Sequence, residues 1–301
     1  MTTAPALETL HGTVGVWTSQ HEQHAPTATG GVAALLDELG FRALWFPEAW
    51  GRESFTSAQL LLSASSRLHV ATGITNIWGR DAVAAANAAR TLNAAFDDRF
   101  VLGLGVSHQP LVERLRGHQY ESPLAHMRAY LEALRAAPMR AIEGEYPFPT
   151  VIAALGPKML ELGAQLADGV HTYLVNVEHT ATARQIIGDA FLAVEQAVVL
   201  GGTREEFLER AHTHLEYYTG LENYRANWRR LGFDDNDFIR GGSERLCDAM
   251  VVHGDETRVL AAIGDHFAAG ASHVCLQVLP AAPAAIPEAE YRRLASALAL
   301  S

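Results

Sequence analysis

Residues 69–105 read HVATGITNIWGRDAVAAANAARTLNAAFDDRFVLGLG. The stretch opens with a short apolar segment, His69–Thr72, and closes with another, Phe100–Leu104, and such segments are typical of buried strands. Between them, Asp81–Phe96 is rich in alanine with apolar residues at helical spacing, and Asp81 suits the N-cap position. We therefore predict a strand, a helix and a second strand, the unit from which parallel α/β folds are built.

The same alternation extends along the chain in both directions. Six further strands are predicted, at Thr13–Trp17, Phe41–Phe46, Val151–Leu155, Gly169–Leu174, Val194–Leu200 and His273–Leu279. Eight strands alternating with helices match a (β/α)8 TIM barrel, and a doubly wound open sheet is the main alternative. The long stretch before the last strand is predicted to be helical and includes a helix at Ser243–Val252. Because no Pro- or Ser-rich linker divides the chain, we predict one barrel domain over residues 1–301.

The composition excludes several classes of protein. There are 34 acidic against 23 basic side chains, a formal charge of −11, which argues against a nucleic-acid partner. No stretch approaches the roughly twenty apolar residues of a membrane span, and Met1–His11 lacks the features of a secretory signal. Cys247 and Cys275 have no metal-like spacing. We expect a soluble, cytoplasmic enzyme without a bound metal.

Barrel enzymes place their sites on the loops that follow the C-terminal ends of the strands. In this sequence those positions are rich in tryptophan and small residues and hold few charges. Such a mouth suits a large planar ring better than a bare sugar or a phosphoester. The candidate positions are Trp17, Thr18, Pro47, Glu48, Trp50, Gly73 to Asn76, Ser107, His108, Gly156, Tyr173 to Glu178, and Gln277.

Several of these positions lie in segments that resemble one known family. Leu44–Glu48 (LWFPE), Thr72–Arg80 (TGITNIWGR) and Phe100–His108 (FVLGLGVSH) resemble the luciferase-like monooxygenase superfamily. Within it, the sequence is most similar to the oxidoreductases that use the deazaflavin coenzyme F420. The resemblance continues through Ala153–Gly169 and Asn223–Phe233 and covers nearly the whole chain in order. The fold that it implies is a (β/α)8 barrel of the bacterial luciferase-like type with insertion segments.

The resemblance implies a cis peptide bond between Gly73 and Ile74, just after the third strand. In the family this bond forms a bulge that backs the central ring of the deazaflavin. Glycine suits the first of these positions because it lacks a Cβ atom. An ordinary turn from strand to loop is the alternative. Glu48 matches an acidic position that contacts the polar edge of the ring, and we expect Asn76 at the same edge, although Glu48 as a surface carboxylate beside Arg52 is also consistent with the sequence.

His108 is the candidate for proton transfer. In the sugar-phosphate dehydrogenase branch of the family a glutamate proton donor matches this position, and a histidine matches the region of Glu48 and Ala49. The sequence departs from that branch at both places, which argues against a sugar-phosphate substrate. Because an imidazole titrates near neutral pH, His108 is the natural acid or base, with Glu48 as the second catalytic candidate. A role for His108 in positioning the cofactor is the alternative.

Two loops that lead into helices are expected to bind the phosphate of the cofactor. They are Leu155-Gly156 and Tyr173–Asn176, and both match phosphate-binding loops of the family. Backbone N–H groups at helix N-termini make such loops suitable for anions. Lys158 is the only lysine of the chain. Few cations are therefore available near these two loops for a polyanionic tail of the cofactor. The predicted cofactor-binding residues are Trp17, Glu48, Thr72, Gly73, Ile74, Asn76, Ser107, His108, Leu155, Gly156, Tyr173, Val175 and Asn176.

These observations favour an oxidoreductase that transfers a hydride between coenzyme F420 and a small organic substrate. An FMN-dependent monooxygenase that uses reduced flavin and oxygen is one alternative, because the two cofactors share ring shape and phosphate. A flavin-binding protein without catalysis is another. A hydrolase or lyase would need a metal or carboxylate cluster at the strand ends, which the sequence does not show. The resemblance also implies a homodimer.

Overall fold

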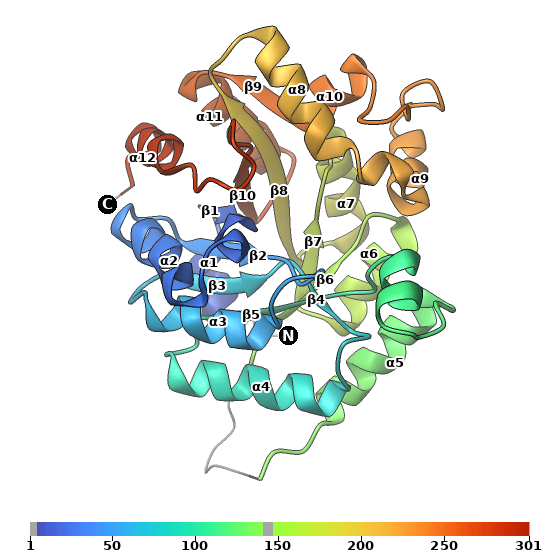
Figure 1. The fold of residues 1–301 in the computed structure, drawn as a ribbon. Helices are drawn as coiled ribbons and strands as arrows, with labels where there is room; N and C mark the ends of the chain where they lie inside the picture. Colours follow the sequence, from blue (N-terminus) through green and yellow to red (C-terminus); the bar gives the residue numbers. More distant parts are fainter. Residues whose placement is uncertain (1–4, 141–146, 301) are drawn as a thin grey trace.

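The computed structural model describes residues 5–140 and 147–300. Its strands all pair in parallel, and eight of them close into a barrel in the order β1-β2-β3-β5-β6-β7-β8-β10 (Figure 1). Strand β10 pairs with both β8 and β1, which closes the sheet and excludes the open doubly wound alternative. The strands are β1 Thr13–Trp17, β2 Ala43–Phe46, β3 His69–Thr72, β4 Thr75–Asn76, β5 Phe100–Gly105, β6 Thr150–Ala153, β7 Gly169–Thr172, β8 Phe191–Leu200, β9 Val251–Gly254 and β10 His273–Val278.

The helices surround the barrel, as Figure 1 shows. Apolar residues alternate along the strands, so that in β2 Trp45 packs inside the barrel while Leu44 and Phe46 pack against the outer helices. Helix α1 contributes Leu7 and Leu10 to the interior cluster. The helices are α1 Pro5–Leu10, α2 Thr29–Glu38, α3 Ser54–Ser63, α4 Ala82–Ala95, α5 Pro123–Ala136, α6 Pro157–Leu166, α7 Val177–Ile187, α8 Arg204–Leu215, α9 Glu222–Arg230, α10 Glu244–Met250, α11 Glu256–Ala268 and α12 Glu288–Ala297.

The barrel prediction is confirmed, and the helix predicted at Ser243–Val252 is wrong at its C-terminal end. Helix α10 stops at Met250, and β9 then pairs with the outer part of β8. An apolar run that continues a helical pattern cannot be assigned to helix or strand from periodicity alone. The strand predicted at Gly169–Leu174 ends at Thr172, because Leu174 adopts a left-handed conformation with φ of 53°.

An inserted segment, residues 201–254, lies between β8 and α11 and contains α8, α9, α10 and β9. Figure 1 shows these elements, coloured gold to orange, gathered beside the upper part of β8. They share a second apolar cluster, in which Phe207, Trp228 and Leu246 pack with Leu174 and other residues of the barrel. The inserted segment follows the C-terminal end of β8. It therefore lies at the end of the barrel where barrel enzymes place their sites. No helix in the described ranges is both long and apolar enough to cross a membrane.

We expect Gly103→Ala to destabilise the barrel. A Cβ atom at Gly103 would lie 1.8 Å from the backbone oxygen of Thr72, on the neighbouring strand. Because a backbone cannot move aside as a side chain can, the free energy of unfolding should fall by about 3 kcal/mol. The matched control is Gly264→Ala, at an exposed position of α11, where a Cβ has nothing within 4 Å. That variant should gain about 0.5–1 kcal/mol. Urea denaturation measures both, and equal stabilities would contradict the argument.

Candidate active site

The loop after β3 carries the cis peptide bond that the resemblance implies, between Gly73 and Ile74. The indole N–H of Trp17 donates to the carbonyl oxygen of Gly73 at 3.1 Å. A Cβ atom at Gly73 would lie 2.8 Å from Trp17 Nε1 and 3.2 Å from His171 Nε2. Glycine is therefore required here by the close approach of two side chains of the barrel interior.

Ile74 projects from this loop and remains half-exposed. A second glycine makes room for it, since a Cβ at Gly105 would meet Ile74 Cδ1 at 2.4 Å. The carbonyl oxygen of Ile74 accepts a hydrogen bond from the backbone N–H of Glu48 at 3.0 Å. The loop is thus fixed from two sides and presents an apolar side chain at the mouth of the barrel.

Glu48 is buried beneath the loop. It forms an ion pair with Arg80, whose Nη1 lies 3.0 Å from Oε2. The same carboxylate accepts from the backbone N–H of Asn76 at 2.8 Å and that of Ser54 at 3.4 Å. Glu48 is buried and its ion-pair partner is Arg80. The alternative of a surface carboxylate beside Arg52 is therefore wrong. The structure gives Glu48 a positioning role, and direct contact with a cofactor or catalysis stays a prediction.

Three other predicted site residues, Thr72, Asn76 and Ser107, differ in burial and in hydrogen bonding. Thr72 is fully buried, and its hydroxyl both donates to and accepts from the backbone of Gly103 in the barrel wall. Asn76 is also buried, and its side-chain oxygen accepts from the backbone N–H of Trp78 at 2.9 Å. Ser107 is half-buried in a left-handed conformation, with φ of 57°, and lies at the opening beside His108.

His108 is half-buried among aromatic rings of the inserted segment. Its ring centroid lies 5.9 Å from those of Tyr217 and of Tyr224. Burial lowers the pKa of His108 to about 4, and no charged group contributes to that shift. The imidazole is therefore neutral at pH 7, able to accept one proton and to donate another.

Beneath His108, aromatic residues of the barrel and the inserted segment form the floor of the mouth. Trp17 and Tyr173 pack with centroids 5.1 Å apart. The Tyr173 hydroxyl donates to Gln277 Oε1 at 2.8 Å and accepts from the Tyr218 hydroxyl at 3.1 Å. The structure thus brings together two predicted residues, Trp17 and Tyr173, from β1 and from the loop after β7.

Glu195 is a residue of this floor that the sequence reasoning missed. It lies on β8 with no exposed surface, and its Oε2 accepts from the backbone N–H of Leu174 at 3.0 Å. Its Oε1 has no partner among the described residues. Burial raises the pKa of Glu195 to about 8, so the side chain is a neutral carboxylic acid at pH 7. The signal was present as one acid in the apolar run FLAVEQAVVL.

The two predicted phosphate loops lie side by side. Gly156 is the N-cap of α6, and Asn176 is the N-cap of α7, where its side chain accepts from the backbone N–H of His179 at 3.0 Å. His179 Nε2 lies 2.9 Å from the carbonyl oxygen of Leu155, which links the loops. Val175 is buried between them. Two helix N-termini therefore meet at this corner of the mouth, a favourable arrangement for an anion.

Arg230, on α9, supplies a cation at this corner and was also missed. Its Nη2 lies 3.5 Å from the position of a Cβ on Gly156. It donates to the neutral Asn227 at 3.1 Å and pairs with no carboxylate of the described residues, whereas Arg229 binds two. Asn227 Nδ2 and His179 Nδ1 are buried without partners in the described part of the chain. The guanidinium of Arg230 and the amide N–H of Asn227 are donors that suit the phosphate of a cofactor, whereas His179 Nδ1 is an acceptor, because Nε2 of this neutral imidazole donates to Leu155.

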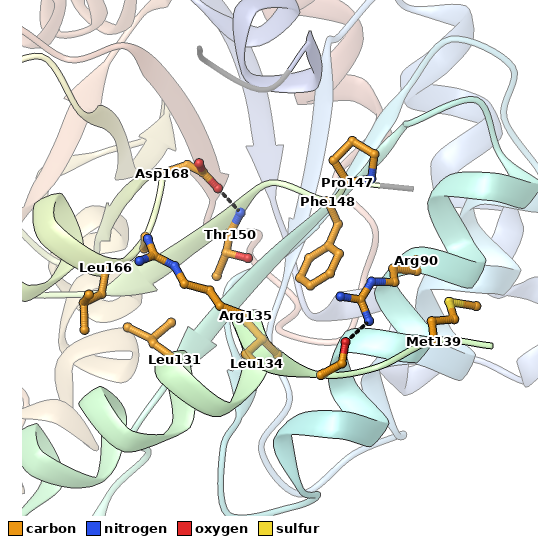
Figure 2. A pocket seen from close by; sticks show the side chains of 12 residues that line it. Arg90, Leu131, Leu134, Arg135, Met139, Pro147, Phe148, Thr150, Leu166 and Asp168 are labelled. Carbon is orange, nitrogen blue, oxygen red and sulfur yellow. Dashed lines mark hydrogen bonds between the residues drawn. The ribbon is translucent and has the colours of Figure 1, made fainter. Parts of the chain in front are cut away.

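A separate hollow of about 800 Å³ lies at the opposite, N-terminal end of the strands (Figure 2). It is lined by Arg90, Arg135 and Phe148, and Asp168 accepts from the backbone N–H of Thr150 on its wall. None of the predicted site residues contributes to it. Within residues 5–140 and 147–300, no group of three or more His, Cys, Asp or Glu side chains could hold a metal ion.

Comparison with known proteins agrees with this geometry. A family model described as luciferase-like monooxygenase matches residues 10–273. The chain belongs to the luciferase-like monooxygenase family. A putative coenzyme F420-dependent oxidoreductase of Mycobacterium tuberculosis is 27% identical over 187 residues, which are 52% of each chain. The 5,10-methylenetetrahydromethanopterin reductase of Archaeoglobus fulgidus is 30% identical over 162 residues, 48% of each chain. The matches thus span about half the length of these curated relatives.

Solved structures of the luciferase-like fold cover nearly the whole chain. The F420-dependent tetrahydromethanopterin reductase of Methanopyrus kandleri superposes with a TM-score of 0.73 at 15% identity, covering 96% of this chain and 99% of that one. An EDTA monooxygenase from Chelativorans gives a TM-score of 0.72 at 10% identity, covering 96% and 93%. At such identities the likeness establishes the fold alone.

Glu195→Gln should change how stability depends on pH. The pKa of Glu195 is about 8 in the folded protein against 4.5 for an ordinary glutamate, so the folded state binds the extra proton between these values. The stability that Glu195 contributes is therefore present below pH 4.5 and is lost as pH rises through 8. The amide cannot ionise, so the stability of the variant relative to the wild type should rise from about pH 5 to pH 8 and level off above pH 8.

Asp168→Asn is the matched control for this measurement. Asp168 is a partly buried carboxylate at the other end of the barrel, and like Glu195 it accepts from a backbone N–H. Burial also raises the pKa of Asp168, so the stability of Asp168→Asn relative to the wild type should likewise rise with pH. Urea denaturation at a series of pH values gives both curves. A constant offset for Glu195→Gln across pH 5–9 would mean that Glu195 is ionised in the folded protein.

Proposed function

We propose that this protein is an oxidoreductase that transfers a hydride between coenzyme F420 and a small organic substrate. The observation that carries the proposal is the Gly73–Ile74 loop, which is held by Trp17 and Glu48 and presents Ile74 at the mouth. The similar sequence of the putative coenzyme F420-dependent oxidoreductase of Mycobacterium tuberculosis supports the choice of a deazaflavin. The guanidinium of Arg230 beside Gly156, next to the unpartnered amide N–H of Asn227, fits a phosphate group of such a cofactor.

A bound deazaflavin would supply or accept the hydride. Ile74 and Gly73 would back one face of its ring, with Trp17 and Tyr173 forming the floor beside it. Backbone N–H groups at the starts of α6 and α7, together with Arg230, would hold its phosphate. His108, neutral at pH 7, would hold or accept a proton at an imidazole nitrogen next to the reacting carbon of the substrate.

An FMN-dependent monooxygenase is the second candidate. Its support is that the same fold occurs in monooxygenases as well as in F420-dependent enzymes, with TM-scores of 0.72 and 0.73 in two examples. Both cofactors carry a tricyclic ring and a phosphate, so the corner at Gly156 and Arg230 serves either. A homodimer and a cytoplasmic location remain predictions from the sequence.

Titration of the purified protein with coenzyme F420 and, separately, with FMN tests the choice of cofactor. We expect micromolar binding of F420, seen as quenching of tryptophan fluorescence, and weaker binding of FMN. Because Trp17 lies on the floor of the mouth, Trp17→Phe should remove a large part of the quenching. A preference for FMN would favour the monooxygenase, and binding of neither would overturn the proposed site.

Arg230→Ala and Arg229→Ala form a matched pair of variants for the same titration. Both arginines are exposed on α9, but Arg229 pairs with Glu222 and Asp235 while Arg230 points to Gly156. Loss of one charge-assisted contact should weaken cofactor binding about tenfold or more in Arg230→Ala. Arg229→Ala should bind as the wild type does. Equal affinities for the two variants would mean that the phosphate lies elsewhere.

His108→Gln separates the enzymatic proposals from a binding protein without catalysis. With a reducible substrate found by screening, turnover should fall by about a hundredfold or more, the usual size of a general acid–base contribution. The cofactor affinity should stay within about threefold, because glutamine keeps a hydrogen-bonding group in the same place. Single-turnover kinetics together with the titration give both numbers. Unchanged turnover would exclude His108 from proton transfer.

A further inference from the structure

Four aromatic side chains form a continuous rim around the outer part of the mouth. Trp50 packs edge-on to Tyr217 at 5.8 Å, Tyr217 contacts His108 at 5.9 Å, and His108 contacts Tyr224 at 5.9 Å. We call these four residues the aromatic rim. They come from the loop after β2, the loop after β5 and the inserted segment, so three parts of the chain distant in sequence meet here.

The exposure of the rim requires an explanation. Trp50 is 66% exposed and Tyr217 is 38% exposed, whereas the floor residue Trp17 is 5% exposed. Exposed aromatic surface is unfavourable in water, and a single ring contact offsets only part of that cost. Clustered apolar surface at the entrance of a pocket usually marks a place where a ligand binds.

The four side chains of the aromatic rim carry no charge at pH 7. His108 is neutral at pH 7, because burial alone lowers its pKa to about 4. The flanking Glu216, next to Tyr217 in the chain, forms an ion pair with Arg240. Glu22, which lies against the loop that carries Trp50, accepts from the backbone N–H of Arg52 at 3.3 Å. A charged ligand packed on these four side chains would therefore lose hydration without gaining a partner of opposite charge among them.

We infer that the aromatic rim binds the substrate of the proposed oxidoreductase, and that this substrate is an uncharged organic molecule with an apolar body of one or two rings. The inference rests on the proposed function for the kind of reaction. Flat aromatic and aliphatic rings pack on Trp50 and Tyr217, while His108 offers the single polar contact at the reacting group. Carboxylates, phosphates and sulfonates are disfavoured.

Groups that favour an anion lie in a different part of the mouth from the aromatic rim. Arg230 and the N-termini of α6 and α7 lie at the ends of β6 and β7, where they favour an anion. Trp50 follows β2 and His108 follows β5. The charged part of a cofactor and a neutral substrate would thus be attracted to different parts of the same opening.

Two fluorescent probes that differ by one charge test the inference. N-phenyl-1-naphthylamine is neutral, and 8-anilino-1-naphthalenesulfonate has the same rings with an added sulfonate. We expect the neutral probe to bind the cofactor-free protein saturably and at least about tenfold more tightly than the sulfonate. Because the whole chain carries a charge of −11, the titrations are repeated in high salt, where only a local preference persists.

Variants locate the bound probe. Trp50→Ala and Tyr217→Ala should each weaken binding of the neutral probe at least about fivefold. Ile239→Ala is the control, since Ile239 is 57% exposed on the same inserted segment but is no part of the rim. Circular dichroism and thermal melting confirm that each variant is folded. Trp50 and Tyr217 are exposed, so these substitutions leave the core intact.

Three results would overturn the inference: equal or tighter binding of the sulfonate in high salt, unchanged binding in Trp50→Ala and Tyr217→Ala, or no saturable binding of the neutral probe. The measurement uses the protein without cofactor, so its outcome is independent of the F420 and FMN titrations. Binding of the probe at the rim by a protein that binds neither cofactor would refute the proposed function and leave the apolar site standing.

Discussion

The carboxylate of Glu48 is buried between three segments and binds a group from each of them. Arg80 neutralises it from the start of α4, and the backbone N–H groups of Asn76 and Ser54 complete its hydrogen bonds. A buried carboxylate without such partners would cost several kcal/mol. The strand β4, the Gly73–Ile74 loop and the start of α3 are therefore held as one unit. The mouth of the barrel takes its shape from this ion pair.

The inserted segment supplies a cation and aromatic side chains at the mouth of the barrel. It contributes Arg230 at the corner of the two helix N-termini, and Tyr217 and Tyr224 at the aromatic rim. It also fixes the loop after β7, because Trp228 Nε1 donates to the carbonyl oxygen of Leu174 at 3.2 Å. The barrel strands thus set the position of the loop that would back the ring, and the inserted segment sets the charge and the apolar surface around it.

The sequence predicts those features that depend on neighbours in the chain. Strand β3, the N-cap at Asp81 and the loop at Gly73 follow from local pattern or from the resemblance, and the structure has all three. Contacts between distant segments leave no such pattern. Arg230 reaches Gly156 across more than seventy positions, and Glu195 gains its unusual environment from other strands and the inserted segment. Arg230 was missed for that reason, whereas Glu195 left a local signal, one acid in an apolar run, that does not reveal the surroundings of the side chain.

Burial also controls the protonation of the mouth, and it acts on acids and bases in opposite directions. It lowers the pKa of His108 to about 4 and raises that of Glu195 to about 8, so both are neutral at pH 7. The pKa of Tyr218 is raised to about 12 by the same cause. Tyr217 and Tyr224 of the inserted segment contact His108, so the segment contributes to this burial. The segment therefore sets the charge of the site as well as its contacts.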